Sequence, residues 1–187
     1  MTMDARVYAG PEGRKKRVAL LLIDFQQGHR GSFTYEHGPL GEGIAKTASV
    51  ISSAQSSGIP VILVSGKVHR DIFPEISEAA GAGAIRLYKK TLDAFKEPDL
   101  ETILSAYDID TIVVGGWIRH ICVMATTAEA LKRGFSVMTS DEILFGNREM
   151  ANLAARRMCL EYYRKNCRLF ETTGELNANL NGPERRA

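Results

Sequence analysis

Apolar runs rich in β-branched residues recur along the chain, and polar or amphipathic segments separate them. Such runs are typical of strands that are buried on both faces. The pattern predicts six strands, at residues 18–23, 61–65, 85–88, 110–116, 135–140 and 168–170. Helical spacing of apolar positions predicts helices at 42–57, 98–107, from 122 to 133 and from about 147 to 165, with a single helical turn at 74–80.

Strands that alternate with helices favour an α/β fold, here a three-layer α/β/α sandwich around a six-stranded, mostly parallel sheet. The expected strand order is the Rossmann-like 3-2-1-4-5-6. A dinucleotide-binding domain is the obvious competitor. However, the first strand ends in Asp24-Phe25-Gln26, without the glycine trio that such a domain needs at this turn.

One domain is predicted, at residues 17–175. Residues 1–16 are polar and predict a flexible arm, and residues 176–187 predict a frayed tail. The basic cluster at 14–17 is interpreted as a solvated terminus, because it is short and has no aromatic residues interleaved. The segment 25–41 is long for a connection and carries aromatic and histidine side chains, which predicts one wall of a pocket.

Composition narrows the class of protein. The chain has 187 residues with 44% hydrophobic content, enough for one domain with a sizeable core. A formal net charge of +2 argues against nucleic acid or an anionic membrane as a partner. The 3 cysteines lack metal-ligand spacing, which indicates reduced thiols. No signal peptide or membrane-spanning run is present, so a cytoplasmic location is expected.

Three side chains with catalytic potential follow predicted strands. Asp24 follows the first strand, Lys89 the third and Cys122 the fourth. Ligands of such sheets bind at the carboxyl ends of the strands, and the first and fourth strands are neighbours in the expected order. Cys122 has two interpretations that the turn position leaves evenly balanced. It is either a small buried hydrophobe or a thiolate favoured by a helix N-terminus.

Three stretches resemble, in order and spacing, the motifs of the isochorismatase-like cysteine hydrolases. They are residues 21–26, 89–95 and 114–135. The resemblance covers roughly residues 17–173. It implies a cysteine hydrolase of small amide or related C–N bonds that works through a thioester. It further implies Cys122 as nucleophile, Asp24 as general base and Lys89 as the third member of the triad.

The same resemblance implies backbone oxyanion donors at Ile118 and Cys122, with a cis peptide between Trp117 and Ile118. The residues expected to contact the substrate are Phe25, Gln26, Phe95, Arg119 and His120. Arg119 stands where the family often has threonine, so Arg119 and His120 suggest a polar or anionic substrate group. A surface Arg–His pair is an equally open interpretation.

No cofactor and no metal are expected. Nicotinamidases of this family carry an Asp-x-His motif after the second strand, whereas residues 65–70 here contain only His69 as a metal-ligand type. The resemblance implies a small-molecule substrate and a homo-oligomer, either a dimer or a tetramer. Apolar and aromatic residues of the last long helix, Leu160, Tyr162 and Tyr163, are candidates for its interface. Two alternatives stay open: a vinyl-ether hydrolase of isochorismatase type, and a non-catalytic oligomeric binding protein of the same fold.

Overall fold

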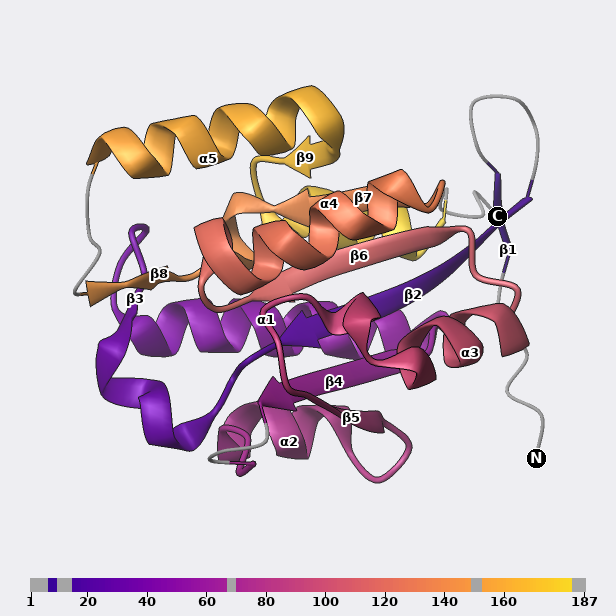
Figure 1. The fold of residues 1–187 in the computed structure, drawn as a ribbon, viewed down its shortest axis with the longest axis horizontal. Coiled ribbons are helices and arrows are strands. Elements are labelled where there is room, and N and C mark those ends of the chain that lie inside the picture. Colours follow the sequence, from indigo (N-terminus) through magenta and orange to yellow (C-terminus); the bar gives the residue numbers. More distant parts are fainter. Residues whose placement is uncertain (1–6, 10–14, 67–69, 149–152, 183–187) are drawn as a thin grey trace, which may run out of the picture.

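The computed structural model describes residues 7–9, 15–66, 70–148 and 153–182 (Figure 1). The strands are β1 (Val7–Ala9), β2 (Lys15–Ile23), β3 (Phe33–Thr34), β4 (Val61–Gly66), β5 (Ile85–Lys89), β6 (Thr111–Gly116), β7 (Ser136–Ser140), β8 (Gly146–Asn147) and β9 (Arg168–Phe170). The α-helices are α1 (Leu40–Ser56), α2 (Pro74–Ala80), α3 (Pro98–Ala106), α4 (Met124–Lys132), α5 (Leu153–Asn166) and α6 (Thr173–Leu180). Four short helical turns are η1 (Gln27–Ser32), η2 (Ala94–Lys96), η3 (Arg119–Val123) and η4 (Asp141–Ile143).

The main sheet has the order β5-β4-β2-β6-β7-β9, and each of these neighbouring pairs is parallel. Numbered along the chain as predicted, this order is 3-2-1-4-5-6, so the predicted fold class and topology are confirmed. Two additions were not predicted. β1 pairs with β2 in antiparallel fashion, and β3 and β8 form a separate two-stranded sheet.

Alternate side chains of residues 18–23 in β2 enter two different cores, which explains why this part of the strand is apolar at every position. One core contains Val18, Leu20 and Leu22 and is completed by residues of α1, α2 and α6. The other contains Ala19, Leu21 and Ile23 and is completed by residues of α3, α4 and α5. Helices therefore cover both faces of the sheet (Figure 1), as the three-layer prediction requires.

Both predicted tails need correction. Residues 176–180 were expected to fray, but they belong to α6, whose Leu176 and Leu180 are buried against α1. Thr172 caps this helix by accepting a hydrogen bond from the Glu175 amide, and helix formation buries both leucines. At the other end, residues 7–9 pair with residues 15–17 instead of forming part of a flexible arm. The other residues of both tails, 1–6, 10–14 and 183–187, lie outside the described residues.

Helix α5 is described from Leu153 onward, and residues 149–152, which include the predicted start at Glu149, lie outside the described residues. Asn147 pairs with Phe33 in the small sheet, so it does not start this helix. Leu160 and Tyr163, named above as interface candidates, are buried in the core, which takes them out of any subunit contact. None of the helices in the described part of the chain is long and apolar enough to cross a membrane.

Candidate active site

Close contact between β2 and β6 forms the centre of the site. Gly116 ends β6 with a φ of 135°, and a Cβ there would lie 2.1 Å from the Ile23 carbonyl oxygen. Only glycine fits this approach. The Trp117 amide then donates to the same oxygen at 2.9 Å. The turn after β6 is thereby fixed directly beside the end of β2, where Asp24 follows.

Asp24 and Lys89 form a buried ion pair at the carboxyl end of the sheet. The Lys89 Nζ lies 2.8 Å from Asp24 Oδ2, and the two side chains are only 5% and 6% exposed. Lys89 also donates to the Thr91 carbonyl oxygen at 3.1 Å. The next residue, Lys90, is exposed. Of the two adjacent lysines, the structure therefore brings the predicted one, Lys89, to Asp24.

Cys122 lies in η3, a π-helical turn that leads into α4. Burial and the charge of Asp24 raise the pKa of its thiol, the charge of Lys89 lowers it, and the balance places the pKa at about 11. The resting form is therefore the thiol. The sequence left two interpretations evenly balanced, a small buried hydrophobe and a thiolate favoured by the helix N-terminus, and burial outweighs the effect of the helix N-terminus on the pKa. Attack by sulfur thus requires a base, and the Asp24 Oδ1 oxygen is buried without a hydrogen-bond partner among the described residues.

The peptide between Trp117 and Ile118 is cis, as the resemblance to the isochorismatase-like cysteine hydrolases implied. Ile118 accepts two backbone hydrogen bonds at its carbonyl, from Ile121 at 2.9 Å and Val123 at 3.3 Å. The second of these spans five residues, and it winds the chain into the wider turn that carries Cys122. The assignment of the Ile118 and Cys122 amides as oxyanion donors stays a prediction.

The predicted substrate residues on the strand-end loops are engaged within the protein. Phe25 is buried among other aromatic rings, Phe33, Phe73 and Phe145. The Gln26 side-chain oxygen accepts a hydrogen bond from the Gly66 amide at 3.1 Å. This bond connects the loop after β2 to the end of β4. These contacts give Phe25 and Gln26 a structural role, and a contact with substrate stays a prediction for them.

Phe95 is likewise 4% exposed and packs against Phe135 in the second core. Its amide donates to the Asp93 side chain, which caps η2. The Ala94 amide donates to Thr126 Oγ1 of α4 at 3.1 Å. The segment after Lys89 is thereby fastened to the helix that follows Cys122. Phe95 supports this arrangement, and its contact with substrate also stays a prediction.

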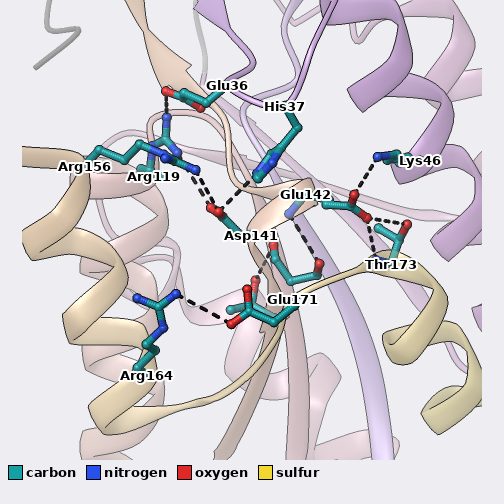
Figure 2. A network of polar contacts seen from close by, with 12 residues as sticks. Glu36, His37, Lys46, Arg119, Asp141, Glu142, Arg156, Arg164, Glu171 and Thr173 are labelled. Atoms are coloured by element: carbon teal, nitrogen blue, oxygen red, sulfur yellow. Dashed lines mark hydrogen bonds and ion pairs between the residues drawn. The ribbon is translucent and has the colours of Figure 1, made fainter. Parts of the chain in front are cut away.

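Arg119 and His120 behave differently from each other. The Arg119 side chain is 3% exposed and pairs with Glu36, and its Nη1 lies 3.9 Å from Asp141 Oδ1 (Figure 2). Burial lowers the pKa of the Arg119 guanidinium. Arg119 is therefore not part of a surface Arg–His pair, and its contact with a polar or anionic substrate group stays a prediction. His120 is half-buried, and burial together with the charge of Arg119 lowers its pKa.

Sequence reasoning missed the partners of Arg119. Asp141 follows β7. Its Oδ2 oxygen lies 3.1 Å from His37 Nε2 and forms an ion pair with Arg156 at 2.9 Å. Its position directly after a strand was the same signal that singled out Asp24. Glu36 lies in the loop predicted as a pocket wall, but nothing in its local sequence indicates its distant partner.

In the described residues, which do not include His69, no three side chains of the His, Cys, Asp and Glu types are grouped to hold a metal ion.

Comparison with known proteins agrees with this geometry. The model of the isochorismatase domain matches residues 18–159, so the chain belongs to the isochorismatase family. One curated relative is isochorismatase domain-containing protein 2 of Xenopus laevis, 27% identical over 129 residues. The match covers 68% of this chain but only 60% of that relative's length.

Solved structures share the fold at low identity. They include MAR1 ribonuclease of Caenorhabditis elegans, with 20% identity, a TM-score of 0.76, and 94% of this chain and 84% of that one covered. The octameric Escherichia coli hydrolase YCAC has 17% identity, a TM-score of 0.75, and coverage of 87% and 78%. N-carbamoylsarcosine amidase of Thermoplasma acidophilum has 22% identity, a TM-score of 0.65, and coverage of 81% and 94%. The chain thus has the fold of isochorismatase-family hydrolases, and the different names of these proteins show that the fold alone does not define the reaction.

Proposed function

We propose that the protein is a cysteine hydrolase that cleaves small amide or related C–N bonds through a thioester intermediate. The observation that carries this proposal is the buried Asp24–Lys89 ion pair beside the Cys122 thiol. Removing two charges from water costs free energy, and a chain that only served as a scaffold would gain little from it. A base, a cation and a thiol at one strand end are what nucleophilic acyl transfer requires.

In the first half of the reaction, Asp24 accepts the thiol proton and the Cys122 sulfur attacks the carbonyl carbon of the substrate. The carbonyl oxygen becomes an oxyanion, and the backbone amides of Ile118 and Cys122 are the proposed donors to it. The C–N bond then breaks, and Asp24 returns the proton to the leaving nitrogen. The products of this half are an amine or ammonia and an acyl thioester on Cys122.

In the second half, Asp24 takes a proton from water while the water oxygen attacks the thioester. The C–S bond breaks, the carboxylic acid leaves, and the sulfur recovers its proton from Asp24. The Lys89 ammonium stabilises both the carboxylate and the developing thiolate. No step of this cycle requires a metal ion.

The name of the similar N-carbamoylsarcosine amidase supports C–N bonds as the substrate class. A vinyl-ether hydrolase would need a general acid but no thiolate, so loss of the sulfur distinguishes the two reactions. We also propose that the protein forms a homo-oligomer, which the octameric assembly of the similar hydrolase YCAC supports.

The direct experiment is a screen of small carboxamides and ureido compounds for ammonia release by the wild-type protein and by Cys122→Ala. We expect at least one substrate in this class, with its hydrolysis abolished in the variant. Release of ammonia at the wild-type rate by Cys122→Ala would overturn the proposal. Hydrolysis of isochorismate by that variant, without any amide turnover by the wild type, would favour the vinyl-ether reaction.

A further inference from the structure

One segment, residues 27–37, contacts the turn that carries Cys122 on both sides of the cis peptide. On one side, the Trp117 indole stacks on Phe33 at 4.9 Å and on His29 at 5.0 Å between ring centroids. On the other side, Arg119 pairs with Glu36. The two residues that flank Ile118 are therefore both fastened to the same segment.

Arg119 is also fixed through its main chain. Its amide donates to the Phe145 carbonyl oxygen at 2.9 Å, and its own carbonyl accepts from the Tyr163 hydroxyl at 2.8 Å. Tyr163 belongs to α5 and is fully buried. The side chain adds a third direction, toward Glu36 and Asp141 (Figure 2).

Gly146 leaves room for the ion pair between Arg119 and Glu36. A Cβ at Gly146 would lie 2.6 Å from Arg119 Nη2, 2.9 Å from Glu36 Oε1 and 2.5 Å from Thr34 Oγ1. A glycine in β8 therefore allows the guanidinium and the carboxylate to meet over the small β3–β8 sheet. Any larger residue there would displace one of them.

The charges of this cluster argue against an anion-binding site. Two arginines, Arg119 and Arg156, face two carboxylates, Glu36 and Asp141, and His37 pairs with the second carboxylate. The fixed charges are balanced without a ligand. The Arg119 side chain is 3% exposed and already has carboxylates of the protein beside it.

We infer that Arg119 is a positioning residue, which acts with Glu36 to hold the Trp117–Cys122 turn in the geometry that the oxyanion requires. The inference rests on the proposed function, because it assigns a purpose to the turn. Backbone dipoles stabilise an oxyanion only when they are aimed at its position beforehand, and small displacements cost large factors in rate. The planar, two-sided donor geometry of arginine suits this task, and lysine cannot reproduce it.

Two probes of Cys122 separate turn geometry from thiol ionisation. Iodoacetamide alkylates sulfur by displacement and forms no oxyanion. Butyraldehyde adds reversibly: the sulfur bonds to the carbonyl carbon, and the carbonyl oxygen takes up the thiol proton and lies at the oxyanion position. The aldehyde dissociation constant is obtained from the protection it gives Cys122 against alkylation, followed by mass spectrometry of the full chain.

We expect Arg119→Lys and Glu36→Gln each to raise the aldehyde dissociation constant by about tenfold to a hundredfold, the scale of a misplaced oxyanion donor. The rate of alkylation without aldehyde should stay within about threefold of wild type, because distant charges change the pKa of the thiol little. Gly146→Ala should have the same effect as these variants, because it displaces the pair without removing it. Arg17→Lys, which alters an ion pair with Asp108 on a different part of the sheet, is the matched control and should behave as wild type.

Glu36 is 26% exposed, so Glu36→Gln serves as the test if Arg119→Lys does not fold. Unchanged aldehyde affinity in a folded Glu36→Gln protein overturns the inference, as does an equal loss in the alkylation rate. Absence of thiohemiacetal in the wild type also overturns it. If aldehyde affinity depends on Arg119 but no amide is hydrolysed, the proposed substrate class fails and the positioning role stands. If amides are hydrolysed equally by all variants, the positioning role fails alone.

Discussion

Replacement of Lys89 by alanine tests the electrostatics of the candidate site. The Lys89 ammonium lies 2.8 Å from Asp24, and its charge lowers the pKa of Cys122, which is about 11 with burial, Asp24 and Lys89 all acting on it. A neighbouring opposite charge typically changes a pKa by about one to three pH units. Lys89→Ala should therefore raise the pKa of Cys122 by at least about one pH unit and lower the thiolate fraction at neutral pH about tenfold or more.

The assay is the rate of Cys122 alkylation by iodoacetamide between pH 7 and 11, with the label located by peptide mapping. The rate should fall about tenfold or more in Lys89→Ala, and kcat/KM for any amide substrate about a hundredfold or more. Because the variant leaves Asp24 buried without its partner, a loss of about 3 kcal/mol in the free energy of unfolding is expected, and thermal denaturation must show a folded protein.

Lys90→Ala is the matched control, because this neighbouring lysine is exposed and surface substitutions change little. A larger effect of Lys90→Ala than of Lys89→Ala, on either the alkylation profile or turnover, would refute the assignment.

Three further predictions concern the other thiols, the C-terminal helix and the assembly. Cys122 should be alkylated faster than Cys159 and Cys167, whose pKa values burial raises to about 12, and peptide mapping that shows either of these labelled first would contradict this. Leu176→Ala should lower the free energy of unfolding by about 2 to 4 kcal/mol, measured by urea denaturation, because its side chain is fully buried; an unchanged midpoint would mean that α6 does not belong to the folded domain. Light scattering at micromolar concentration should give the mass of a dimer or a larger oligomer, and a monomeric mass would refute the proposed assembly.

The sheet was predictable because its central strands, β4, β6 and residues 18–23 of β2, are buried on both faces. An apolar run such as residues 18–23 must be buried between two layers of helices. The strand order then follows from the right-handed crossovers and the usual strand order of doubly wound sheets. Helix α6 was missed because asparagines and the following Gly182 and Pro183 suggested fraying. The overlooked signal was Leu176 and Leu180, four residues apart, after the capping residue Thr172.

The site was predictable only in part, for a similar reason. Asp24 and Cys122 follow strands and Lys89 ends one, so the strand order alone brings their backbones to one edge of the sheet. The environment of each side chain does not follow from the strand order. The sequence left a buried thiol and a thiolate evenly balanced at Cys122, and burial, which local sequence does not reveal, decides for the thiol. The same limit applies to Arg119, because its partner Glu36 is 83 residues away along the chain and meets it only where Gly146 leaves space.

The most direct test of the account is the detection of an acyl group on Cys122 during turnover. An amide substrate from the screen is mixed with the protein, the reaction is stopped with acid, and the intact mass and peptide map are recorded. The account predicts a mass increase equal to the acyl group, located on Cys122 and absent from Cys122→Ala. Continued release of ammonia by Cys122→Ala, with no acyl adduct on the wild-type protein, would contradict it.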